Sequence, residues 1–125
     1  MILYSWNVNG IRAVIKKGLF QKFIANHQPD ILCLQETKAK QGQAEIDLPE
    51  YKEFWSSADR AGYSGTAIFT KMPPIKVTYG FSPELKEIPD MSDIYGDPTR
   101  EGRLLQPSLK IFLSLLYTLR IVRMI

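Results

Sequence analysis

The sequence predicts a layered α/β fold, because an apolar strand, an amphipathic helix and a second apolar strand follow one another within residues 1–35. Such a strand–helix–strand unit favours parallel neighbouring strands, whose carboxyl ends lie at one edge of the sheet. Asn7 and Glu36 follow these two strands. We therefore expect a ligand site at this edge, where layered α/β proteins tend to bind their ligands.

Hydrophobic spacing predicts the first elements. Residues 1–6 form a short apolar run that leads into Asn-Val-Asn-Gly, which is typical of a strand. From residue 11 to residue 27, apolar side chains recur every three or four positions, which predicts a helix that is broken or kinked near Gly18. Pro29 and its neighbours end this helix, and residues 31–34 predict a second buried strand.

The elements that follow are shorter. A short helical turn is expected over residues 45–48. Three further strands are predicted at residues 51–56, 65–70 and 75–79. Residues 81–100 are polar and punctuated by proline, which predicts a loop.

The composition indicates a globular intracellular protein. The chain has 125 residues, of which 45% are hydrophobic and 23% charged, ordinary values for one small domain or part of a larger one. Its single cysteine, Cys33, cannot form an internal disulfide, which favours a reducing compartment. No signal peptide is recognisable, and the nine uncharged residues between Lys110 and Arg120 are too few to cross a membrane. We expect a cytoplasmic protein without a membrane partner.

The net charge of +3 comes from the last part of the chain. Up to Arg103 there are 13 Lys and Arg and 13 Asp and Glu, whereas residues 104–125 contain three basic residues and no acidic one. The excess therefore carries little weight as a sign of nucleic-acid binding.

A lone carboxylate beside an amide makes a site of hard oxygen ligands with few protein contributions. Mg²⁺ prefers such a site, because it keeps several waters and takes one or two carboxylates together with substrate phosphate. The ion can polarise a phosphoryl oxygen and neutralise a leaving oxygen. From these residues alone, a solvated glutamate at a strand end is an equally good interpretation of Glu36.

Four stretches of the sequence resemble motifs of the exonuclease III family of apurinic/apyrimidinic endonucleases. They are residues 5–13 (Ser-Trp-Asn-Val-Asn-Gly-Ile-Arg-Ala), 34–38 (Leu-Gln-Glu-Thr-Lys), 62–71 (Gly-Tyr-Ser-Gly-Thr-Ala-Ile-Phe-Thr-Lys) and 101–103 (Glu-Gly-Arg). The match covers about residues 1–103, with the motifs in the family's order. The wider endonuclease/exonuclease/phosphatase superfamily shares the asparagine and Gln-Glu positions, whereas Asn-Gly-Ile-Arg-Ala and the Thr-Lys after Glu36 point to its DNA-repair branch.

The resemblance implies a four-layered, two-sheet β-sandwich flanked by helices, of which this chain would form the N-terminal half. It implies a site for Mg²⁺, or for Mn²⁺ in its place, at Asn7 and Glu36. It also implies four contacts to the DNA backbone, each of which has an ordinary solvated surface residue as its alternative: Arg12, Lys38, Tyr63 and Ser64.

The function that follows from the resemblance is that of an exodeoxyribonuclease III or AP endonuclease. Such an enzyme is a Mg²⁺-dependent DNA phosphodiesterase of base-excision repair. At full length it would act as a monomer on double-stranded DNA with abasic sites or 3′ ends. Two alternatives remain: another phosphoesterase of the superfamily, acting on a phospholipid or inositol phosphate, and a non-catalytic DNA-binding fragment.

Two features of the family's catalytic machinery are missing from the sequence. The family's histidine comes near its C-terminus, whereas the single histidine here, His27, lies at a predicted helix end, where a surface or capping role is expected. The Asp-x-Asn motif that positions the attacking water is also absent. We therefore expect this chain to be inactive by itself.

Residues 104–125 depart from the family pattern. The family continues with a strand resembling Ile-Thr-Ala-Glu-Phe-Glu, and one set of codons for residues 104–110, read in another frame, encodes that sequence. We therefore interpret residues 1–103 as the N-terminal part of the family domain and residues 104–125 as an aberrant, frameshifted tail. Within the tail, Tyr117 resembles a remnant of the family's catalytic tyrosine motif, although Leu119 stands where proline is expected.

Overall fold

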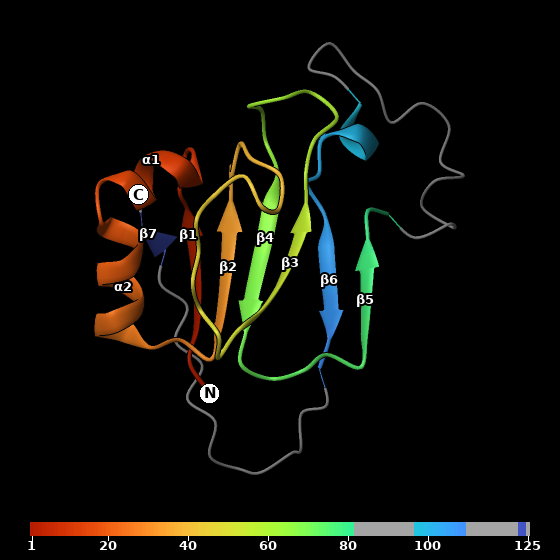
Figure 1. The fold of residues 1–125 in the computed structure, drawn as a ribbon. Helices are drawn as coiled ribbons and strands as arrows, with labels where there is room; N and C mark the ends of the chain where they lie inside the picture. The colour runs from red at the N-terminus through yellow and green to blue at the C-terminus, as the bar shows by residue number, and fades with distance from the viewer. Residues whose placement is uncertain (82–96, 110–122, 125) are drawn as a thin grey trace.

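The computed structural model describes residues 1–81, 97–109, 123 and 124 (Figure 1). Its centre is a five-stranded sheet with the strand order β3-β4-β2-β1-β7. These strands are β1 (Leu3–Asn7), β2 (Ile31–Gln35), β3 (Lys52–Ser56), β4 (Thr66–Thr70) and β7 (Arg123–Met124). β1 pairs in parallel with β2, as predicted, and with β7, whereas β4 runs antiparallel between β2 and β3.

Two helices connect β1 to β2. They are α1 (Ile11–Lys16) and α2 (Leu19–His27), and Figure 1 shows both beside β1. The helix is broken at Gly18, as predicted, because this residue takes a left-handed conformation with φ of 69°. α2 ends at His27, which is exposed, and Tyr4 Oη lies 3.3 Å from its Nδ1 atom.

The hydrophobic core lies between these helices and one face of the sheet. The Phe23 ring of α2 packs against Trp6 of β1, with 5.0 Å between the ring centroids, and the Phe20 ring lies 5.8 Å from that of Phe69 in β4. Side chains alternate between the two faces of a strand, so Asn7 points away from the face that carries Trp6. The end of β1 is therefore anchored by a buried tryptophan and finishes in an exposed amide.

A second, two-stranded antiparallel sheet follows, formed by β5 (Lys76–Tyr79) and β6 (Leu105–Ser108). β6 contacts both β3 and β4. A short 3₁₀ helix, η1 (Pro98–Arg100), precedes β6. β6 lies within the segment interpreted as an aberrant tail, and it carries Pro107 opposite Val77. Proline is tolerated at a sheet edge because it lacks only a donor that an edge does not need.

The prediction of a helical turn over residues 45–48 was wrong. This segment has no helical hydrogen bonding, and turns lie instead at residues 41–42 and 49–50. Ile46 and Leu48 are both half-buried against the core. Apolar residues two positions apart share one side of an extended chain but not of a helix, so their burial favours the extended form.

The other predicted strands agree with the structure to within one or two residues at their ends. Most of the predicted loop, residues 82–96, lies outside the described residues, as do residues 110–122. Among the residues that the structure describes, no helix combines the length and apolar character needed to span a bilayer.

Candidate active site

The predicted site lies where β1 and β2 end side by side. Asn7 pairs in register with Gln35, which places Glu36 one residue beyond the end of the ladder. Asn7 Nδ2 donates a hydrogen bond of 2.7 Å to Glu36 Oε1. The structure therefore brings together the amide and the carboxylate that the sequence placed at neighbouring strand ends.

The orientation of the Asn7 amide is set by the turn after β1. Asn7 Oδ1 accepts a 3.0 Å hydrogen bond from the backbone N–H of Asn9. The amide oxygen is thus held by the turn, and the amide nitrogen holds Glu36. The second carboxylate oxygen, Glu36 Oε2, points to Lys38. Asn9 belongs to the first motif but was given no role from the sequence.

The backbone of residues 36–38 is fixed from both sides. Glu36 and Lys38 take left-handed conformations, with φ of 53° and 52°, around Thr37, which is almost fully buried. The Thr37 N–H donates to the Gly65 carbonyl at 3.1 Å, and the Lys38 N–H donates to the Ser64 carbonyl at 2.8 Å. The Tyr-Ser-Gly motif is therefore a direct backbone support for the Gln-Glu-Thr-Lys motif.

Two cationic side chains stand at the same edge. Lys38 Nζ hydrogen-bonds Asn9 Oδ1 and lies 3.7 Å from Glu36 Oε2. Arg12, at the start of α1, donates from its guanidinium to the Lys38 carbonyl at 3.3 Å. These contacts give the carboxylate a basic border.

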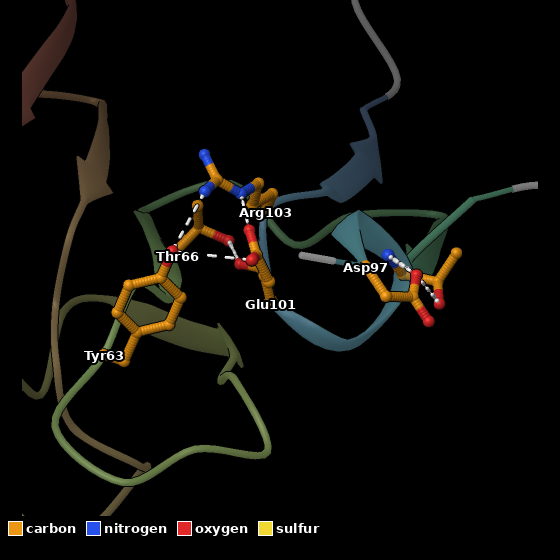
Figure 2. Close-up of polar contacts among 7 residues, drawn as sticks. Tyr63, Thr66, Asp97, Glu101 and Arg103 are labelled. Atoms are coloured by element: carbon orange, nitrogen blue, oxygen red, sulfur yellow. Dashed lines mark hydrogen bonds and ion pairs between the residues drawn. The ribbon is translucent and has the colours of Figure 1, made fainter. Parts of the chain in front are cut away.

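A second group of polar side chains surrounds Tyr63 (Figure 2). Tyr63 Oη donates to Glu101 Oε1 at 3.5 Å, and Arg103 donates to Tyr63 Oη at 3.5 Å and forms an ion pair with Glu101. The hydrogen bond to Glu101 raises the pKa of the Arg103 guanidinium, so this group keeps its charge. Sequence analysis identified Glu-Gly-Arg as a motif, but only the structure joins it to Tyr63.

Close to Tyr63 lies an open cleft of about 400 Å³. Its lining includes Arg60, whose guanidinium carbon lies 5.4 Å from the centroid of the Tyr63 ring, an arrangement typical of a cation–π contact. Asp97, at the start of η1, accepts hydrogen bonds from the Thr99 N–H at 2.9 Å and hydroxyl at 2.6 Å, which lowers the pKa of the Asp97 carboxyl (Figure 2). Arg100 pairs with Asp59 at 2.7 Å. The cleft is thus rich in paired charges.

The residues at the Asn7–Glu36 edge fit a hard, sparsely ligated cation. No three His, Cys, Asp or Glu residues converge into a metal cluster among the described residues. Glu36 is nevertheless 45% exposed and presents carboxylate oxygen to solvent, which is the donor that Mg²⁺ prefers when water and phosphate complete its coordination. Tyr117 lies outside the described residues.

A family model describing the endonuclease/exonuclease/phosphatase family matches residues 4–112. The match covers most of the chain and includes all four motifs as well as β6. The chain therefore belongs to the endonuclease/exonuclease/phosphatase family.

Within the family, the curated relatives place the chain in the DNA-repair branch that its motifs predicted. It is 46% identical to the exodeoxyribonuclease of Bacillus subtilis (strain 168) over 84 residues, which cover 67% of this chain and 33% of the relative. It is 44% identical to the DNA repair nuclease APEX1 of Danio rerio over 89 residues, which cover 67% of this chain and 28% of that protein. The chain thus spans about a third or less of these relatives.

The fold agrees with a solved member of this group. The structure of the 3′ phosphatase NExo from Neisseria, bound to a product DNA hairpin, matches with a TM-score of 0.54 and 30% sequence identity, covering 69% of this chain and 33% of that chain. The mixed α/β architecture predicted from the sequence is therefore that of the exonuclease and AP endonuclease fold.

Proposed function

We propose that this chain supplies the metal-binding and part of the DNA-binding half of a DNA phosphodiesterase of base-excision repair. The enzyme would cut the backbone 5′ to an abasic site and remove nucleotides from 3′ ends. The observation that carries the proposal is the Asn7–Glu36 pair at the carboxyl ends of two parallel strands, bordered by Lys38 and Arg12. The names of the relatives, an exodeoxyribonuclease and a DNA repair nuclease, favour DNA over a phospholipid or inositol phosphate.

The proposed cofactor is Mg²⁺, with Mn²⁺ as a substitute. Members of the family generally use divalent metals, and such an ion lowers the barrier by neutralising charge that develops on the phosphoryl group. Glu36 would bind it through carboxylate oxygen. Asn7 would orient that carboxylate through its 2.7 Å hydrogen bond, or contribute its own oxygen after the amide turns.

The proposed DNA contacts are four side chains at this edge and in the loop whose backbone contacts it: Arg12, Lys38, Tyr63 and Ser64. Arg12 is exposed, Lys38 is 35% exposed and Tyr63 is half-buried, so cationic and hydroxyl groups can face a phosphate backbone without unfolding the edge. Contacts of this kind fix the register of the duplex and carry no base preference. Ser64 lies in a loop that already contacts the site, because its own backbone carbonyl accepts a hydrogen bond from the Lys38 N–H.

Binding and chemistry are proposed to reside in different parts of the family domain. General-base groups that activate water would come from the remainder of that domain, because the sequence lacks the Asp-x-Asn motif. Tyr117, for which a catalytic role is proposed, lies outside the described residues. The chain by itself is therefore proposed to bind a divalent ion and DNA without appreciable turnover, which is the behaviour of a non-catalytic DNA-binding fragment.

An assay with an abasic duplex tests the proposal. We expect the chain to bind the duplex in the presence of Mg²⁺ and to leave it uncut, and Glu36→Gln to weaken divalent-ion binding by at least about 10-fold. A longer version that includes the remaining family domain should nick the same duplex. Turnover by the chain alone at the rate of a full-length relative would contradict the division of roles, and equal ion binding by Glu36→Gln would contradict the metal site.

A further inference from the structure

The two oxygens of the Glu36 carboxylate have different protein neighbours. Oε1 accepts the 2.7 Å hydrogen bond from the Asn7 amide, whereas Oε2 lies 3.7 Å from the ammonium of Lys38. The same ammonium hydrogen-bonds Asn9 Oδ1. Lys38 therefore stands on the side of the carboxylate that is open to a cation.

The backbone brings this ammonium to the carboxylate at some conformational cost. Left-handed φ values of 53° at Glu36 and 52° at Lys38 are uncommon for residues other than Gly, Asn and Asp. They persist because buried Thr37 between them is held by its hydrogen bond to Gly65. Strained residues of this kind cluster at functional sites. The juxtaposition of Glu36 and Lys38 is thus imposed by the fold.

A divalent ion and the Lys38 ammonium would compete for the same oxygen. Mg²⁺ approaches a carboxylate oxygen to about 2.0–2.1 Å, so an ammonium that stays beside the same oxygen would be repelled by it. Lys38 can leave, since its side chain is 35% exposed and lysine carries its charge on a flexible four-carbon stem. A phosphate oxygen is the natural new partner for three ammonium donors.

We propose that Lys38 is an exchangeable counter-cation, which neutralises Glu36 in the unloaded site and turns to a DNA phosphate when Glu36 takes a divalent ion. This inference rests on the proposed function and adds a positioning role for Lys38 to its expected DNA contact. We expect Lys38 to have two effects of opposite sign. Lys38 opposes ion binding in the absence of DNA, and it strengthens DNA binding once the ion is present.

The first measurement is a Mn²⁺ titration of the whole chain without DNA. Lys38→Met should bind Mn²⁺ about 2- to 5-fold more tightly than the parent chain, the range expected when one partly exposed ion pair is removed. Lys40→Met is the matched control, because Lys40 is exposed, two positions away and not paired with Glu36. It should leave Mn²⁺ affinity unchanged. Unchanged or weaker binding by Lys38→Met would overturn the proposal.

The second measurement is the salt dependence of duplex binding. With Mn²⁺ present, Lys38→Met should lower the slope of log affinity against log salt by about 0.9, the value expected when a single phosphate interaction is removed. Without Mn²⁺ the same substitution should change the slope little, because Lys38 is held by Glu36. An equal change with and without Mn²⁺ would overturn the exchange.

Failure of the proposed function has a different signature. If the parent chain and Glu36→Gln both fail to bind Mn²⁺, the metal site itself is refuted, and the exchange with it. If Glu36→Gln alone loses Mn²⁺ while Lys38→Met behaves like the parent, only the exchange is refuted. Far-ultraviolet circular dichroism of each variant verifies that the fold is retained.

Discussion

At the scale of single residues, two glycines allow chain segments to approach where a side chain has no room. Gly65 has a φ of +90°, and a Cβ atom there would lie 2.6 Å from Thr37 Oγ1. Gly102 has a φ of +61°, and a Cβ atom there would lie 2.5 Å from the carbonyl oxygen of Ser56. Gly102 sits between the two residues that hold Tyr63, so its close approach positions the group shown in Figure 2.

Gly102→Ala should destabilise the chain by about 2–4 kcal/mol, because the new methyl group meets rigid backbone in a left-handed conformation. Gly62→Ala is the control: it shares a positive φ of +69° but has nothing within 4 Å of the added atom. It should lose only about 1 kcal/mol. Urea unfolding midpoints measure the stability of both variants. Equal losses would show that the contact of the added methyl group with residues 56–58 does not determine the loss.

The raised pKa of Tyr51 predicts a loss of stability at alkaline pH. Burial, followed by the charges of Glu50 and Asp30, raises the pKa of Tyr51 to about 12, and its hydroxyl donates to the Pro29 carbonyl at 2.5 Å. Since the folded state favours the protonated phenol, this contribution is complete below the unfolded pKa near 10 and is lost as the pH rises towards 12.

The measurement is the urea midpoint as a function of pH for the parent chain and for Tyr51→Phe. The parent should lose stability relative to the variant between about pH 10 and pH 12. Parallel curves over this range would show that Tyr51 titrates alike in the folded and unfolded states.

At the scale of elements, the site depends on how β1 and β2 are held against α2. α2 and β1 meet through aromatic side chains: the Phe23 ring lies 5.0 Å from Trp6 and 5.1 Å from Tyr4, centroid to centroid. Trp6 immediately precedes Asn7. The same packing that stabilises the helix therefore fixes the strand end that carries the site.

Phe23→Ala should cost about 3–5 kcal/mol, because it removes a buried ring from a core that cannot collapse around the space. Leu19→Ala in the same helix is the control, since Leu19 is 48% exposed. It should change the stability by less than about 1 kcal/mol. Thermal or urea unfolding compares the two variants. Because alanine is the better helix former at both positions, an equally large loss in both would show that burial of the side chain does not set the cost.

At the scale of the whole molecule, charge placement matters more than net charge. Residues up to Arg103 are formally balanced, yet Arg12 and Lys38 lie at one edge beside Glu36. DNA affinity should therefore depend on a few placed cations, with a small salt slope.

Arg12→Gln should reduce the magnitude of that slope by about 0.9, because one cation no longer neutralises a phosphate. Lys22→Gln removes the same charge from the exposed part of α2 and should leave the slope unchanged. Fluorescence anisotropy of a labelled duplex across a salt series gives both values. Equal reductions would mean that net charge governs binding.

Residues 104–125, which we interpret as a frameshifted tail, include β6. The structure pairs Leu105–Ser108 with β5, and the family match extends to residue 112. The proposed frameshift predicts that the gene, read in another frame after the codon for Arg103, encodes the family's expected strand. Sequencing of the locus measures this directly, and an uninterrupted frame that encodes residues 104–125 would contradict it.

Much of the local structure followed from sequence periodicity. The break at Gly18, the end of α2 near His27 and the parallel pairing of β1 with β2 all depend on patterns within about 35 residues. The turn expected at residues 45–48 failed because Ile46 and Leu48 are anchored by the distant core. A short segment has too little local preference to resist such packing.

From the sequence alone the family could be identified and the candidate site residues predicted, because strand ends and motif residues are local properties. How these residues contact one another follows only from the tertiary structure. Contacts between distant chain segments place Gly65 against Thr37 and Arg103 against Tyr63. The contact at Thr37 in turn holds Lys38 beside Glu36. Such contacts arise when the strands β2, β3 and β4 assemble, and this depends on core packing and loop closure, which periodicity does not encode.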